Sequence, residues 1–395
     1  MKFLPAKIFI LFLFFFLPSL VMSQTTGTNT NGTNSSAIPT AVPFLNITPD
    51  SRSGAMGEAG VAISPDVNAN FWNPAKLAFL QNNNDIALSY SPWLRQLVPD
   101  ISLSYLSYAH KIDERNSIGL SLRYFNYGTI QLTDANQNNE GTYSPNEFSI
   151  NGAYSRKFGD EFSLGLTMGF VHSNLSNAFF SGASGQQARA GNALAAGVSL
   201  FYTSLTQEFG KDAIFSFGAN VSNIGSKISY SDTGPSYFLP ANLKIGFANT
   251  WNMDDYNQLT VTFDLNKLLA PTPPIRDANG NIIKGTDDNV SVVSGIFGSF
   301  TDAPGGFSEE LQEINVSPGI EYWYNQQFAL RAGYFYQNPN KGGAQYMTFG
   351  VGFKYSDYTF DFSYLAASQQ NSPLANTLRF TISANFGGNK NATKR

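Results

Sequence analysis

The sequence has no cysteine and only two histidines among its 395 residues. The first absence excludes disulfides and thiolate chemistry, and it suits an exported chain that crosses an oxidising compartment while unfolded. General acid–base and nucleophilic catalysis commonly use histidine, and His110 and His172 fall on different predicted strands. The composition therefore gives little basis for an enzyme.

Charge is also scarce. Only 13% of the residues are charged, and the formal net charge is −4. A chain with this balance carries no basic surface for nucleic acid, so we expect no nucleic-acid partner. The sequence contains no phosphate-binding loop, dinucleotide fingerprint, nucleophile elbow or cluster with metal-ligand spacing. We therefore predict no cofactor and no metal.

Long hydrophobic runs are missing beyond the N-terminus. The run at residues 8–17 is shorter than the roughly 20 residues that a spanning helix requires, and no later stretch approaches that length. Lys2 and Lys7 precede this run, and a small-residue site follows at residues 21–23. These features predict a cleavable signal peptide over residues 1–23.

What the sequence does contain is a segment of about ten residues that recurs about fourteen times after residue 84. Within each copy, apolar residues alternate with small or polar ones, and a turn follows. In the last copy one face carries Leu378, Phe380, Ile382, Ala384 and Phe386, and the other carries Arg379, Thr381, Ser383 and Asn385. The pattern predicts an all-β membrane protein, an antiparallel transmembrane β-barrel of about 14 strands in a Gram-negative outer membrane.

The predicted strand boundaries give an even count, as single-chain bacterial barrels require. They are 85–91, 101–112, 117–128, 147–158, 163–173, 190–204, 213–225, 239–252, 257–269, 315–325, 328–338, 345–356, 358–367 and 376–386.

The remaining segments differ from these strands in composition. Residues 24–38 are rich in Thr, Asn, Gly and Ser without periodicity, which predicts a disordered leader. Residues 39–84 mix Gly and Pro with apolar residues at no strand period, which predicts an N-terminal plug inside the barrel of residues 85–386. A periplasmic cap outside the lumen is the alternative. Residues 387–395 form a polar C-terminal tail.

Charged residues occupy the predicted inward positions of several strands. Facing lipid would cost about 2 to 4 kcal/mol for each basic residue near the midplane, so we expect these side chains to face the lumen. Pairing with each other or with the plug is one role, and ion selectivity is the alternative. The residues are Arg123, Lys244, Asp264, Glu321, Arg331, Lys354, Asp361 and Arg379.

Three long connections interrupt the pattern, at residues 129–146, 174–189 and 270–314. The second contains Phe179 and Phe180, which we interpret as cargo-binding residues, although self-packing of the loop would also explain them. The third predicts a pair of short helical insertions broken near Pro304. Its side of the membrane stays open, because one additional strand near residues 289–300 would reverse it.

The segment Val171-His172-Ser173-Asn174 is similar to the active-site strand of outer-membrane phospholipases. In those enzymes the histidine and the nucleophile are two residues apart and point to the same side. Here His172 and Ser173 are adjacent, and adjacent residues of a strand face opposite sides. The sequence therefore argues against a lipase.

Two stretches resemble a known family. Residues 52–79, with Gly57, Asp66 and Phe71-Trp72-Asn73-Pro74-Ala75, resemble the N-terminal region of FadL-like outer-membrane proteins. Within that superfamily the chain resembles the PorV (LptO) family of the Bacteroidetes type IX secretion system, most specifically at residues 300–311 and further at 321–324 and 330–334.

This resemblance implies a non-enzymatic role in protein secretion. The implied partners are the giant outer-membrane secretion pore, secreted cargo with C-terminal signal domains, the sortase-like protease of the attachment complex, and outer-membrane lipid. The alternative is a FadL-type transporter of hydrophobic small molecules, whose mark would be an apolar lane through the lumen and a strand kink that opens to lipid. Pro240 and Pro318 are the candidate kinks, and a general diffusion porin is a third possibility.

Overall fold

The computed structural model describes residues 37–94, 100–133, 136–175, 189–232, 234–367 and 376–387. The predicted signal peptide, nearly all of the predicted leader, residues 388–395 of the predicted tail and the pair Phe179 and Phe180 lie outside these residues. No helix in the described ranges is long and apolar enough to cross a membrane.

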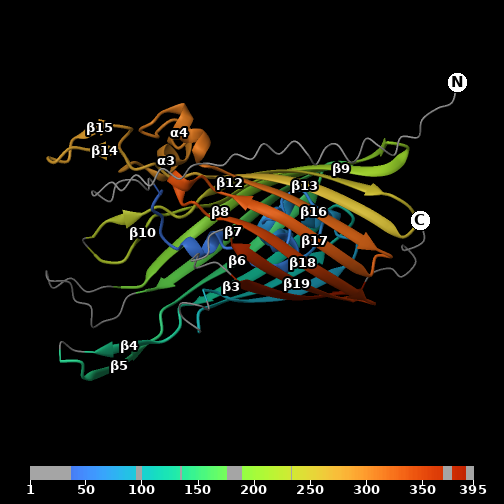
Figure 1. Cartoon of the computed structure of the whole chain (residues 1–395), viewed down its shortest axis with the longest axis horizontal. Coiled ribbons are helices and arrows are strands. Elements are labelled where there is room, and N and C mark those ends of the chain that lie inside the picture. Colours follow the sequence, from blue (N-terminus) through green and yellow to red (C-terminus); the bar gives the residue numbers. More distant parts are fainter. Residues whose placement is uncertain are drawn as a thin grey trace. The chain divides into compact units, whose positions relative to one another are not determined.

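Fourteen antiparallel strands close into one barrel (Figure 1). Closure is made by the first and last strands, which pair from Asn84↔Phe386 to Tyr90↔Phe380. The strands are β1 (Asn84–Pro92), β2 (Ser102–Lys111), β3 (Asn116–Asn126), β6 (Asn146–Lys157), β7 (Phe162–Asn174), β8 (Gly191–Glu208), β9 (Lys211–Gly225), β12 (Asn242–Asn252), β13 (Asn257–Leu268), β16 (Ile314–Tyr324), β17 (Phe328–Tyr336), β18 (Gln345–Tyr355), β19 (Tyr358–Ala367) and β20 (Thr377–Phe386).

The alternation of apolar and polar residues fixes which side chains face out. In β3 the side chains of Ile118, Leu120, Leu122 and Tyr124 are exposed on the outer wall, while those between them, small or charged, are buried together with Phe125. The same alternation recurs in β18 and β20. An outer surface this apolar is compatible with lipid contact. The predicted fold class is confirmed, and most strand boundaries agree within one to three residues.

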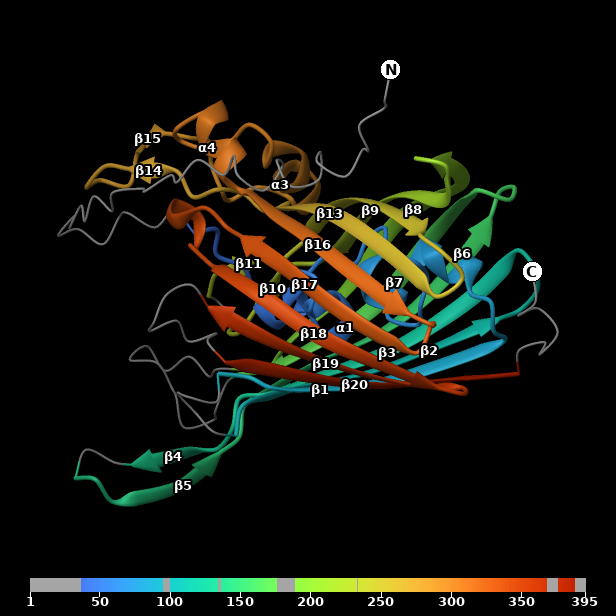
Figure 2. The ribbon, with the colours of Figure 1, turned by 45° about the vertical axis from the view of Figure 1, so that its right-hand side comes forward.

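Short and long connections lie at opposite ends of the barrel. At one end the turns are short, such as residues 209–210 and 356–357. At the other end lie all the long connections, including the hairpins β4–β5 (Ile130–Thr133, Asn139–Tyr143), β10–β11 (Ile228–Ser229, Ser236–Tyr237) and β14–β15 (Ile275–Arg276, Ile282–Lys284) (Figure 2). Long loops of bacterial barrels are extracellular.

The 270–314 connection lies at this long-loop end. It contains β14–β15 and two short helices, α3 (Val292–Gly298) and α4 (Phe307–Gln312). The residues near 289–300 thus form a helix and add no strand to the barrel, so the strand count stays even. This resolves the side of the connection, which the sequence left open.

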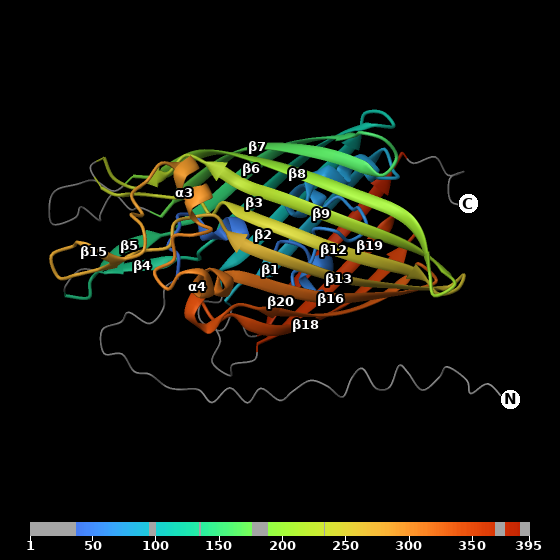
Figure 3. The same cartoon turned by 90° about the horizontal axis from the view of Figure 1, so that it is seen from above.

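Residues 41–80, which we call the inner segment, contain four short helices surrounded by the barrel strands (Figures 2 and 3). They are η2 (Pro43–Asn46), α1 (Ser51–Gly54), α2 (Ala69–Trp72) and η3 (Pro74–Phe79). Most of their side chains are buried. A further short helix, η4 (Pro339–Lys341), lies between β17 and β18.

Candidate functional site

The backbone of the inner segment touches the barrel wall at positions that only glycine allows. A Cβ on Gly333 of β17 would lie 2.1 Å from the backbone nitrogen of Gly57, and a Cβ on Gly319 of β16 would lie 2.5 Å from the carbonyl oxygen of Met56. Real Cβ atoms do not approach backbone this closely. The wall therefore carries glycine where the inner segment presses against it.

The motif at residues 71–75 joins the inner segment to several strands. Trp72 Nε1 donates a hydrogen bond to Asp50 Oδ1 (2.6 Å). Asn73 Nδ2 donates to the carbonyl of Leu200 in β8 (2.9 Å), and Asn73 Oδ1 accepts from the backbone of Ala75 at the start of η3. The Ala75 carbonyl accepts from Ser155 of β6 (2.9 Å) and from Ser163 of β7 (2.7 Å). Pro74, the first residue of η3, has no N–H to satisfy.

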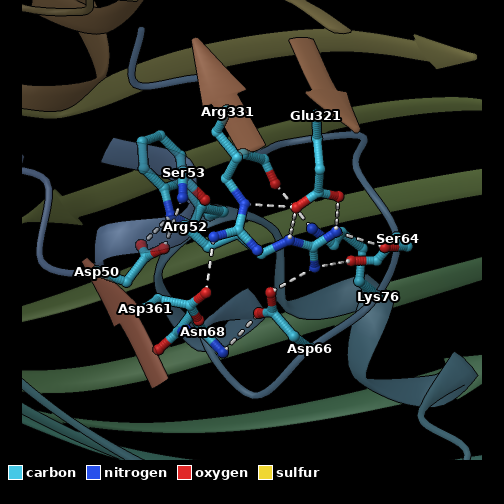
Figure 4. A network of polar contacts seen from close by, with 12 residues as sticks. Asp50, Arg52, Ser53, Ser64, Asp66, Asn68, Lys76, Glu321, Arg331 and Asp361 are labelled. Carbon is cyan, nitrogen blue, oxygen red and sulfur yellow. Dashed lines mark hydrogen bonds and ion pairs between the residues drawn. The ribbon is translucent and has the colours of Figure 1, made fainter. Parts of the chain in front are cut away.

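A buried ion network connects the inner segment to three strands (Figure 4). Arg52 of α1 donates through Nε and Nη2 to the two carboxylate oxygens of Glu321 in β16, at 2.9 and 2.7 Å. Arg331 of β17 donates through Nε to Glu321 (2.7 Å) and through Nη1 to Asp361 of β19 (2.7 Å). Glu321 thus lies between two guanidinium groups.

Arg52 also pairs with the inner segment itself. Its Nη1 contacts Asp66 Oδ2 at 2.8 Å, and its Nη2 donates to Ser64 Oγ at 2.6 Å. All three guanidinium nitrogens of Arg52 therefore donate to polar partners. Charges buried in this way are tolerated because they are paired and hydrogen-bonded.

The remaining predicted lumen charges also lie against the inner segment, with one exception. Asp264 Oδ2 accepts from the backbone N–H groups of Gly60 (2.7 Å) and Val61 (2.9 Å). Arg379 Nη2 donates to Glu58 at 3.1 Å. Lys354 is the exception: it is half-buried in β18 near the short-turn end.

Two cations enclose the aromatic part of the motif. The guanidinium of Arg123 lies 4.4 Å from the ring centre of Phe71, and the ammonium of Lys244 lies 4.2 Å from the same ring and 4.4 Å from that of Trp72. Arg123 also donates to the backbone carbonyls of Phe44 and Leu45. Both cations thus contribute to holding the inner segment against β3 and β12.

The inner segment and the described wall strands enclose a small cavity. A cavity of about 50 Å³ lies between the inner segment and strands β3, β6, β7 and β9, and polar residues such as Ser121, Asn151 and Asn220 form much of its lining. This volume holds about four water molecules. The cavity is not the apolar lane that the transporter alternative requires.

The sequence missed the inner partners of the network. Arg52, Glu58 and Asp66 lie in a stretch without periodicity, so nothing marked them as ion-pair partners of Glu321 or Arg379. One feature of the sequence could have identified them. Residues 39–84 are predicted to lie inside the barrel and are mostly small or apolar, so a charged side chain there needs a buried partner.

The two histidines take part in no catalytic arrangement among the described residues. His172 contacts Asn192 Oδ1 through Nδ1 at 2.8 Å, whereas Ser173 is fully buried and donates to Glu147 (2.6 Å). They face opposite sides of β7, as the sequence predicted. His110 contacts Asn84 at 2.9 Å. The described residues contain no group of three His, Cys, Asp or Glu residues that would hold a metal.

A second ion cluster lies outside the lumen, under α4. Lys267 Nζ of β13 contacts Glu310 at 2.9 Å and Glu313 at 2.6 Å. Lys341 Nζ of η4 contacts Glu309 at 2.6 Å and Glu313 at 2.9 Å. The glutamates of α4 and its C-terminal end are thus directed at one lysine of the barrel wall and one of η4.

The pKa of Asp302, beside this cluster, is raised to about 6, first by burial and then by the neighbouring carboxylates of Glu310 and Glu313. The backbone N–H of Thr272 donates to Asp302 Oδ2 at 3.2 Å and partly offsets these effects. Asp302 therefore titrates closer to neutral pH than an ordinary aspartate.

Comparison with known families shows the family of this chain. The model of the family described as type IX secretion system protein PorV matches residues 30–275. No curated protein sequence matches this chain.

Comparison with solved structures gives matches to outer-membrane channels. A deletion mutant of TodX, a monoaromatic hydrocarbon channel, is 14% identical, with 85% of this chain and 99% of that chain covered and a TM-score of 0.51. The Ralstonia pickettii toluene transporter TbuX is 12% identical (85% and 96% covered, TM-score 0.45), and a Pseudomonas aeruginosa FadL homologue is 13% identical (87% and 99% covered, TM-score 0.40). At such identities the likeness concerns the fold alone.

Proposed function

Because the chain belongs to the PorV family of type IX secretion system proteins, we propose that it binds the C-terminal signal domains of cargo at the secretion pore and delivers them to the cell-surface attachment complex. Its location is the outer membrane, in keeping with the family and the barrel fold. In this role it is not an enzyme. Its partners are the pore, the cargo and the sortase-like protease of the attachment complex. The family membership carries the proposal.

The filled interior supports this role over transport through the lumen. The inner segment is connected to the wall by Arg52–Glu321, by Asp264 and by the hydrogen bonds of Asn73. Because the inner segment fills the lumen, partners bind at the long-loop end of the barrel. There the β4–β5 hairpin is exposed along most of its length. The predicted cargo contacts Phe179 and Phe180 lie outside the described residues.

The test is affinity purification from mildly solubilised outer membranes, followed by mass spectrometry. We expect a very large β-barrel and secreted proteins that share a C-terminal domain. Two variants refine it: one replaces residues 130–143 with a short turn, and the other is F179A/F180A. A shortened β14–β15 hairpin is the matched control, because it alters the same end of the barrel.

Correct insertion of each variant is checked by its resistance to unfolding in detergent. Loss of cargo from either test variant, with cargo retained by the control, supports the loop assignment. Full cargo recovery from both would overturn that assignment, and recovery of the barrel without pore or cargo would overturn the secretion role.

One observation favours the second candidate, a FadL-type transporter of hydrophobic molecules. Between β16 and β17 the paired residues pass from Val316↔Tyr336 directly to Gly319↔Gly333, so Pro318, which has no N–H, interrupts the ladder inside β16. On the inner side this position is covered by Met56 and Gly57. Co-purification of lipophilic compounds in place of protein partners would support this candidate.

A further inference from the structure

The helical part of the 270–314 connection has its polarity reversed relative to a helix in water. Residues 291–313 contain four charged side chains, Asp302, Glu309, Glu310 and Glu313, and all are buried or half-buried. The large apolar side chains are the exposed ones. A surface helix in water directs its apolar face to the protein and its charges to solvent.

Four exposed side chains form what we call the rim patch. Phe297 of α3 is 74% exposed, and Phe307 and Leu311, one turn apart on α4, are 76% and 53% exposed. Phe300 is 44% exposed, and its ring lies 5.8 Å from Lys267 Nζ. No charged residue of α3 or α4 is exposed beside these side chains.

The patch lies against the outer face of the barrel. Lys267 pairs with Ile314 across β13 and β16, while Phe263 pairs with Pro318 and Val261 with Ile320. Because side chains alternate along a strand, Lys267 has the same outward orientation as Val261 and Phe263. An outward lysine at this position is neutralised by Glu310 and Glu313, which α4 places over it.

The level of α4 coincides with the end of the lipid-facing band. The outward positions of β16 run from Tyr324 to Ile314 without a charge: Tyr324, Tyr322, Ile320, Pro318, Val316 and Ile314. Ten residue steps span about 33 Å along a strand, or about 25 Å along the normal of a barrel with the usual strand tilt, which matches the usual height of the apolar band. Since α4 ends two residues before Ile314, it lies at the membrane boundary.

From this continuity we propose that the rim patch is inserted into the outer leaflet of the membrane, at the boundary between headgroups and acyl chains. Short helices with a large apolar face occupy this depth, and aromatic residues favour it. The lysine–glutamate cluster underneath neutralises the charges that α4 and β13 bring to this boundary. The helices thus anchor the base of the connection, and the β14–β15 hairpin, with its exposed Arg276–Asp288 pair, remains in water.

Site-directed spin labelling of the full chain tests this proposal. The natural sequence has no cysteine, so each single cysteine carries the only label. The test variants are F297C, F307C and L311C. Ile283 of the hairpin is 61% exposed and apolar, which makes I283C the matched control for water, and I320C on the outer wall is the control for lipid.

In phosphatidylcholine vesicles, collisions with oxygen and with a water-soluble nickel chelate are compared at each label. We expect the oxygen-to-nickel ratio at 297, 307 and 311 to exceed that at 283 severalfold and to lie below that at 320, which is deeper in the bilayer. Ratios equal to that at 283 would overturn the proposal. Shielding that appears only in native outer membranes, and not in lipid vesicles, would also overturn it and assign the patch to a protein partner.

Discussion

Glu321 links two cations at the interface between the inner segment and the barrel wall. Its two oxygens accept from Arg52 and from Arg331, and its side chain is 1% exposed. Removing one partner from such an arrangement leaves buried charges without compensation, which is more costly than the net contribution of the pair. Position 321 is therefore sensitive to a change as small as a carboxylate to an amide.

We expect E321Q to lower the free energy of unfolding by about 3 to 5 kcal/mol, because two guanidinium groups lose their shared carboxylate. The measurement is denaturant unfolding of the purified barrel in detergent. E114Q is the matched control: Glu114 pairs with Lys111 at 2.9 Å but is 91% exposed, and exposed pairs contribute about 0 to 1 kcal/mol. Equal losses in the two variants would contradict the role of the buried network.

The close approach at Gly333 gives a second residue-scale prediction. G333A places a Cβ against the backbone of Met56 and Gly57, so we expect a loss of about 1 to 3 kcal/mol in unfolding free energy from overpacking. G152A is the matched control, since the nearest atoms to its Cβ would be 3.9 Å away. Thermal unfolding of both variants measures the difference. If they unfold at the same temperature, the inner segment does not press on β17 in solution.

At the scale of elements, α4 and η4 depend on a cluster of mixed charges. Lys267 and Lys341 meet three glutamates of α4 and its C-terminal end, while Asp302 adds a further carboxyl beside them. The cluster therefore has more acidic than basic groups. Its stability should depend on the protonation of Asp302, whose pKa is raised to about 6 by burial and by the neighbouring carboxylates.

This charge balance predicts a pH dependence for Asp302. Its folded pKa lies above the unfolded value of 3.8, so the folded state binds the extra proton between about pH 4 and 6. Wild-type stability relative to D302N should therefore rise as the pH falls from 7.5 to 4.5. Thermal unfolding of both proteins across this range measures the difference in stability. The pH dependence that comes from the glutamates is common to both proteins and cancels in the comparison. A difference independent of pH would contradict the raised pKa.

At the scale of the whole molecule, a barrel wide enough for a pore has its interior occupied by its own chain. Fourteen strands enclose more space than wall side chains fill, and residues 41–80 occupy it with buried side chains and hydrogen bonds to at least six strands. The cavity of about 50 Å³ is too small for a path through the lumen.

The closed interior predicts that the reconstituted barrel conducts no ions. In a planar bilayer we expect no stable current steps under an applied voltage, because the described inner segment packs against the wall strands and the cavity beside it measures only about 50 Å³. A general diffusion porin inserted by the same procedure is the positive control. Reproducible steps from the purified protein would show that the inner segment leaves the lumen.

The sequence by itself determined the barrel. Alternation with a period of two is a local property, so the outward faces, the strand count and most boundaries followed from residues that are neighbours in the chain. The inward orientation of Glu321, Arg331 and Asp361 followed in the same way, from the parity of each position along its strand.

Only the tertiary structure decided which charges meet. Arg52 and Glu321 are 269 positions apart, and no local pattern specifies a contact at that separation. Lys267 is a second example. Its position along β13 predicts a side chain that faces lipid, but in the structure α4 lies over it and brings Glu310 and Glu313 into contact with it. Pairing of buried charges depends on the three-dimensional path of segments without periodicity, and the sequence pattern carries no information on that path.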